Sequence, residues 1–84
     1  MPWPVEYQPD YDRVRDQLSP GDRLLVGEAE DRIAENPDPR LDGRFEVDGY
    51  IYDRNPQDFV IEYRMLDQGW ISLDRLIDLR NPDL

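Results

Sequence analysis

The chain has 84 residues, a length that favours one domain comprising residues 1–84. Its 20 acidic and 10 basic side chains give a net charge of −10. It contains no cysteine and no histidine, which excludes disulfides, thiolate chemistry and the usual general base and metal ligand. An apolar fraction of 38% that includes 11% aromatic residues indicates a folded chain despite the charge.

The N-terminal residues predict an extended segment followed by a short helix. Three prolines before Asp10 favour extended backbone, with Trp3 as an anchor to the rest of the chain. Asp10 fits an N-cap, and the sequence at 19–22 predicts a turn that ends the helix. Apolar side chains recur between these points at helical spacing: Tyr11, Val14 and Leu18.

The next two segments are predicted to be a strand and a loop. Residues 23–29 are interpreted as the first strand, which contributes Leu24 and Val26. Residues 30–43 contain several proline and glycine turn signals, so we predict a long, polar and mostly irregular loop. A loop of this length is unusual in a small domain and is typical of a functional or mobile segment.

The second half of the chain predicts an antiparallel meander. Strands are expected at 44–53, 59–66 and 70–73, and Gly69 suits the positive φ of the turn before the last of them. We predict one helical turn at 72–76 and then a closing strand at 77–79. Residues 81–84 are interpreted as a tail.

A single pairing register gives these strands one apolar side. We pair Ile51 with Ile61 across the first turn, and Met65 with Ile71 across the second. The side chains then predicted to point inward are Phe45, Val47, Ile51, Phe59, Ile61, Tyr63, Met65, Ile71 and Leu73. The opposite side is mixed, as expected for a half-buried antiparallel sheet.

Three fragments, 20–26, 47–63 and 69–76, give this layout a resemblance to small SH3-like barrels of the Tudor and KOW type. The resemblance implies a mainly β fold, with 20–80 as a small antiparallel barrel and 1–19 as an N-terminal extension with a short helix. It also implies binding of peptides, nucleic acid or partner proteins through aromatic residues.

The predicted outer face carries four candidate partner-binding residues: Tyr50, Tyr52, Arg64 and Trp70. Tyrosine and tryptophan are enriched at interface hot spots, and Arg64 could stack on an aromatic ring and hold an anion. A second interpretation is that the N-terminal helix covers this face. The small core favours the covered arrangement, because it would bury several large side chains.

The composition also suggests a habitat. Fourteen of the acidic residues are aspartate and every basic residue is arginine, a pattern typical of halophilic proteins, especially those of haloarchaea. At molar salt the screening length falls to about 3 Å, which removes most of the self-repulsion of such a surface.

Catalytic, cofactor and metal sites are not expected. Paired carboxylates occur, but a meander of this size offers little room for the pocket that acid–base catalysis needs. Oxygen ligands in the loop could hold a hard cation, but their spacing is not that of an EF-hand, so we interpret them as solvated: Glu35, Asn36, Asp38 and Asp42.

The sequence predicts function only at the level of class. We expect a soluble, cytoplasmic, non-enzymatic interaction or adaptor domain from a halophile. We expect a monomer that binds a protein through the aromatic face or the 30–43 loop, without a cofactor. Two alternatives are an SH3-like nucleic-acid-binding module and an acidic DNA-mimic inhibitor. No membrane span is expected, because no long apolar run occurs.

Overall fold

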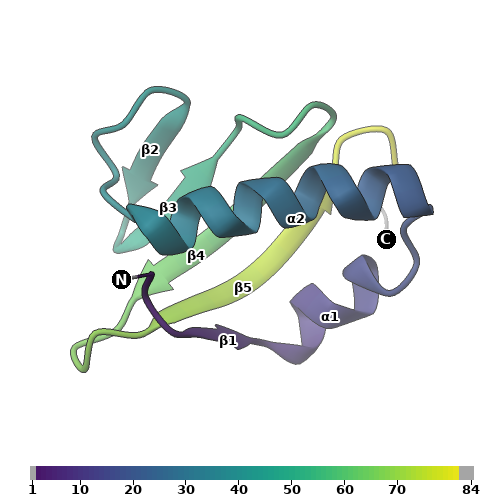
Figure 1. The fold of residues 1–84 in the computed structure, drawn as a ribbon. Coiled ribbons are helices and arrows are strands. Elements are labelled where there is room, and N and C mark those ends of the chain that lie inside the picture. Colours follow the sequence, from purple (N-terminus) through teal and green to yellow (C-terminus); the bar gives the residue numbers. More distant parts are fainter. Residues whose placement is uncertain (1, 82–84) are drawn as a thin grey trace.

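The computed structural model describes residues 2–81 as five strands and two helices (Figure 1). In chain order these are β1 (Val5–Tyr7), α1 (Pro9–Arg15), α2 (Pro20–Glu35), β2 (Arg44–Val47), β3 (Tyr50–Asp53), β4 (Phe59–Met65) and β5 (Ile71–Asp78). The strand order is β1-β5-β4-β3-β2, with β1 parallel to β5 and the other pairs antiparallel. The fold is therefore mainly β, with an open mixed sheet. The SH3-like barrel prediction is wrong, because the edge strands β1 and β2 do not pair to close the sheet.

The N-terminal predictions are largely confirmed. The extended segment forms β1, and the Trp3 backbone N–H donates to the Ala34 carbonyl at 2.8 Å while its side chain packs against the core. The short helix is α1, whose N-cap is Gln8 rather than Asp10 and which ends at Arg15. The turn predicted at 19–22 is wrong from residue 20, because Pro20 begins α2. Of the predicted tail, residues 82–84 lie outside the described residues.

The segment from residue 20 to 35 is one helix, so the predicted strand at 23–29 and the loop from residue 30 are wrong there. The Ser19 hydroxyl accepts a hydrogen bond from the Asp22 backbone N–H, and Pro20 occupies the first turn. The buried residues of α2 follow a helical period: Val26, Ala29, Glu30 and Ile33. Leu24 is 67% exposed because a helix, unlike a strand, turns it away from Val26.

The predicted strand at 44–53 is a hairpin of β2 and β3. Asp48 and Gly49 both have positive φ, of 52° and 86°, which is the pattern of a tight two-residue turn. The chain folds back at this point, so Val47 pairs with Tyr50 and Phe45 with Tyr52. Phe45 and Val47 therefore lie on the same face as the tyrosines, and their predicted inward orientation is wrong.

The predicted pairing of β4 with β5 is confirmed at Met65–Ile71, and Gly69 has a φ of 82°. The β3–β4 register differs from the prediction by two residues, since Ile51 pairs with Tyr63, so the faces are unchanged. The helical turn predicted at 72–76 is wrong, because β5 runs unbroken. A register shift at Glu62/Tyr63 leaves Asp74 as the extra residue of a β-bulge.

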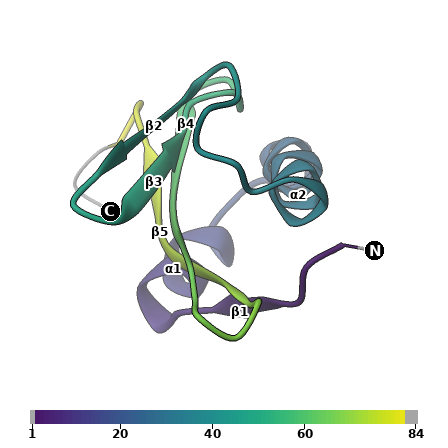
Figure 2. The ribbon, with the colours of Figure 1, turned by 90° about the vertical axis from the view of Figure 1, so that its left-hand side faces the viewer.

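The core lies between α2 and the inward face of the sheet, with α1 alongside β5 (Figure 2). Its members are Tyr11, Val14, Val26, Ala29, Ile33, Ile51, Phe59, Ile61, Tyr63, Ile71, Leu73 and Leu76. Met65 was predicted to point into this core but is 39% exposed at the end of β4. Figure 2 shows α2 on one side of the sheet only. The N-terminal helix α1 buries Tyr11 and Val14 in this same core, so the expectation that it covers the outer face is wrong.

A buried arginine orders the loop between α2 and β2. The Arg44 side chain is 3% exposed, pairs with Asp53 at 2.9 Å, and donates to the backbone carbonyls of Asn36 and Asp38. The Tyr63 hydroxyl donates to the Pro37 carbonyl at 2.8 Å. The irregular part of the predicted loop is therefore fastened to the sheet by hydrogen bonds.

For residues 2–81, neither helix has the length and apolar character required to cross a bilayer.

Candidate functional site

The face of the sheet that points away from α2 is the candidate site, and we call it the open face. β2 and β3 contribute Phe45, Val47, Tyr50 and Tyr52, and β4 contributes Arg64. Phe45, Val47 and Tyr50 are 42%, 49% and 38% exposed. The Phe45 and Tyr52 rings stack with centroids 5.0 Å apart. Large apolar side chains that a small domain leaves together on one face are typical of an interaction surface.

Arginines lie over two of these rings. The Arg64 guanidinium is 5.4 Å from the Tyr50 centroid, and that of Arg54 is 5.5 Å from Phe45. Asp74 holds Arg64 by two hydrogen bonds, of 2.7 and 3.1 Å, which raise the pKa of Arg64. Aromatic rings with fixed cations above them offer flat contact area at a low cost in side-chain entropy.

Trp70 lies apart from this group, on the turn between β4 and β5. Its side chain is 44% exposed and borders an open hollow of about 680 Å³, shared with Val5, Glu6 and Leu66. Of the four predicted site residues, the structure therefore brings Tyr50, Tyr52 and Arg64 together on the open face. Their role in binding stays a prediction.

The carboxylates that are buried among the described residues all have partners. Each is paired with an arginine, in the pairs Glu30–Arg15, Asp53–Arg44, Glu62–Arg75, Asp74–Arg64 and Asp78–Arg80. Hydrogen bonding to Glu62 raises the pKa of Tyr52. Each of these carboxylates therefore has a cation within 3.9 Å, which offsets part of the cost of burying its charge.

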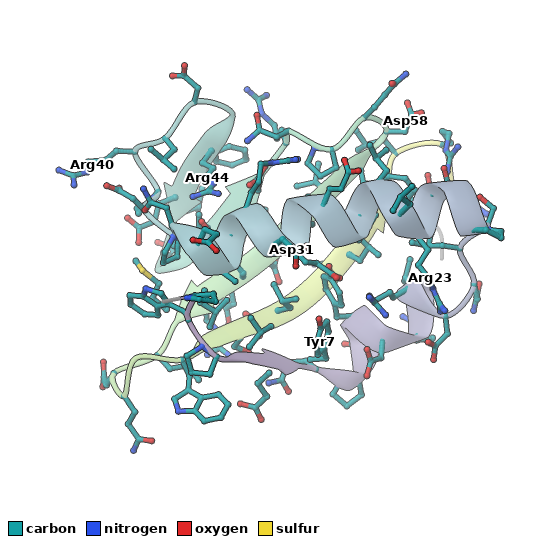
Figure 3. All side chains as sticks on the ribbon, in the orientation of Figure 1. Tyr7, Arg23, Asp31, Arg40, Arg44 and Asp58 are labelled. Atoms are coloured by element: carbon teal, nitrogen blue, oxygen red, sulfur yellow. The ribbon has the colours of Figure 1, made fainter. Side chains whose placement is uncertain are left out.

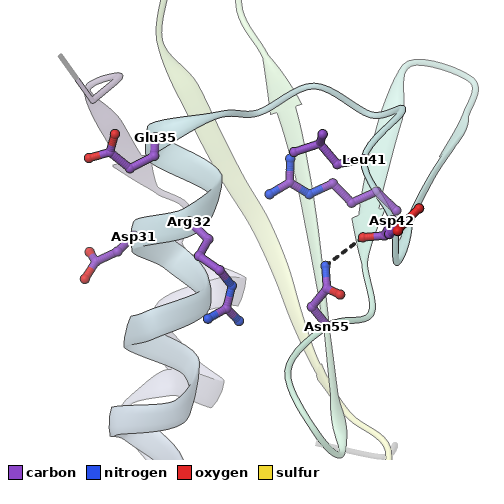
Figure 4. A pocket seen from close by; sticks show the side chains of 7 residues that line it. Asp31, Arg32, Glu35, Leu41, Asp42 and Asn55 are labelled. Carbon is purple, nitrogen blue, oxygen red and sulfur yellow. Dashed lines mark hydrogen bonds between the residues drawn. The ribbon is translucent and has the colours of Figure 1, made fainter.

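A second hollow lies between the C-terminal end of α2 and the segments before β2 and after β3 (Figure 4). It has a volume of about 660 Å³, and one of its walls is closed by a hydrogen bond from the Asn55 amide to the Asp42 carbonyl. Asp31, Arg32 and Glu35 border it from the helix. Within residues 2–81, no cluster of three or more acidic side chains is placed to hold a metal ion.

Sequence reasoning missed Phe45, Val47 and Arg54 as members of the open face. The signal was present in Asp48-Gly49, one of the strongest dipeptide indicators of a two-residue hairpin. A hairpin turn at these two residues would have predicted that Phe45 and Val47 lie on the same face of the sheet as Tyr50 and Tyr52.

Comparison with known proteins yields a likeness in fold. No family model matches the sequence, and no curated protein matches it. A chain of the toxin–antitoxin complex RelBE2 from Mycobacterium tuberculosis is similar, with a TM-score of 0.73 and 20% identity over 90% of this chain and 96% of that one. A chain of the archaeal RelE–RelB complex from Pyrococcus horikoshii OT3 has a TM-score of 0.74 and 17% identity over 94% and 97%.

These likenesses correct the functional prediction. The chain shares its fold with proteins of toxin–antitoxin complexes, so the generic adaptor, the SH3-like nucleic-acid module and the DNA mimic are set aside as wrong. The halophilic, haloarchaeal origin finds no support in the fold or in these neighbours. Both neighbours are assemblies of two proteins, which agrees with the expectation of a protein partner.

Proposed function

We propose that the chain is the toxin-type subunit of a two-protein toxin–antitoxin pair and that its open face binds a protein. The observation that carries this proposal is the fold match, which spans nine-tenths of the chain in two complexes of this kind. A toxin must remain folded after its partner is removed. The continuous core and the absence of unpaired buried side-chain N and O atoms within 2–81 support that role over the antitoxin role.

The free chain is proposed to act by binding rather than by bond cleavage. It has no histidine, lysine or cysteine, and each buried carboxylate among the described residues is paired with an arginine. We propose further that the chain is a cytoplasmic monomer of one domain until it meets its partner, with no cofactor.

Controlled expression of the full chain in a bacterial or archaeal host tests the role. The proposal predicts growth arrest when the chain is made alone, and recovery when the protein encoded beside it is also made. Growth that is unaffected at high expression would contradict the toxin role. Mapping of RNA ends during the arrest, repeated on RNA incubated with the purified chain, tests the mechanism. New ends that appear in both experiments would show that the chain is an enzyme.

Two matched variants test the surface. Tyr50 and Met65 are 38% and 39% exposed but lie on opposite faces of the sheet. Tyr50→Ala should relieve growth arrest and weaken the complex, whereas Met65→Ala should preserve both. Equal effects of the two substitutions would contradict the proposal that the open face binds the protein partner.

A further inference from the structure

A second surface, separate from the open face, lies on the helical side of the molecule. It is a groove of about 540 Å³ between α2 and the segment formed by β1 and α1. Figure 3 shows Tyr7, Arg23 and Asp31 around this space. We call it the interhelix groove; its lining includes Tyr7, Arg15, Arg23, Leu24, Gly27, Glu28 and Asp31.

Two large apolar side chains of the interhelix groove are exposed to solvent. Leu24 is 67% exposed and Tyr7 is 41% exposed, and they face the groove from α2 and β1. The Tyr7 ring is held in place by the Arg15 guanidinium at 5.4 Å and by the Tyr11 ring at 5.9 Å. The groove therefore has a fixed apolar wall without a covering element from the described chain.

Gly27 is the least expected residue in the groove. A glycine inside a helix destabilises that helix relative to alanine, so it normally has a packing reason. A Cβ placed on Gly27 would meet nothing within 4 Å, so the packing of this chain does not require the glycine. What the glycine does provide is a low point on α2 where another backbone can approach closely.

The charged side chains of the groove determine which charge a binding partner should carry. Arg15 is already paired with Glu30 at 2.9 Å, and Arg23 with Asp16 at 3.4 Å. Glu28 and Asp31 have no ion-pair partner among residues 2–81. The free charge along this part of α2 is negative, so it complements a basic partner and repels nucleic acid.

We propose that the interhelix groove docks a basic amphipathic helix of a protein partner, with its apolar side on Leu24 and Tyr7 and its basic side chains toward Glu28 and Asp31. A helix suits a groove between helices, and its backbone crosses at Gly27. The inference does not depend on the toxin role, because it concerns a different surface.

The test uses the full chain and a labelled synthetic helical peptide with leucine and alanine on one side and lysine on the other. Its counterpart has glutamate in place of lysine. Gly27→Gln fills the groove, and Gly21→Gln is the matched control, since Gly21 is also in α2, also has free space around a Cβ and does not line the groove. Fluorescence anisotropy gives the Kd values, and thermal melting reports folding.

The proposal predicts that Gly27→Gln weakens binding of the basic peptide at least tenfold, while Gly21→Gln changes it less than twofold. Both variants should melt at or above the temperature of the unsubstituted chain, because glutamine is the better helix former. Equal Kd values for the two variants would overturn the proposal, and so would equally tight binding of the acidic peptide. The growth assay of the toxin role is unaffected by either result.

Discussion

Removing the guanidinium of Arg44 should destabilise the protein more than any exposed arginine substitution. Arg44 and Asp53 are 3% and 1% exposed and only 2.9 Å apart, so Arg44→Met leaves a buried carboxylate without its cation. Breaking a buried pair in this way costs about 3–5 kcal/mol. The total stability expected of 84 residues is only about 4–13 kcal/mol, so the loss is a large fraction of it.

Urea unfolding monitored by tryptophan fluorescence measures this loss, because Trp3 packs against the core. With a slope of about 1 kcal/mol/M, the midpoint should fall by about 3 M or more. The matched control is Arg40→Met, since Arg40 is 88% exposed and pairs with Asp38 on the surface. Its midpoint should stay unchanged. Equal shifts for the two variants would refute the assignment of Arg44 as the residue that fastens the loop.

Three further outcomes are expected. Ser19→Ala should lower the free energy of unfolding by about 1 kcal/mol in the same urea experiment, because it removes the N-cap of α2; no change would contradict the cap. Burial raises the pKa of Tyr63 to about 12, so its contribution to stability is complete below pH 10 and is lost as the pH rises through about 12. Tyr63→Phe should flatten that alkaline loss in melts taken from pH 9 to 12. Ile61→Ala should cost about 2–5 kcal/mol, whereas Tyr50→Ala should cost less than about 1 kcal/mol; similar costs would show that the open face is covered.

The β4–β5 hairpin could be predicted because its turn and its pattern agree. Gly69 fixes the turn, and Met65–Ile71 follows from it. The bulge at Asp74 could not be predicted in the same way. It places Leu73 and Leu76 on the same side three residues apart, a spacing that alternation does not produce and that resembles a helix.

The long helix was missed because its local signals conflict. Gly21 and Gly27 weaken the helical propensity, and Leu24 with Val26 imitates the alternation of a strand. The decisive signals were the Ser19-Pro20 start and the spacing of Val26 and Ile33. Exposure of the open face could not be predicted, because it depends on which face of the sheet α2 covers.

Nuclear Overhauser contacts from the methyl groups of Val26 test the central claim that α2 covers one face of the sheet and leaves the other open. In this arrangement we expect Val26 to contact core side chains such as Ile61 and to make no contact with Tyr50. Contacts between Val26 and Tyr50, or strand-type chemical shifts at Val26, would contradict it.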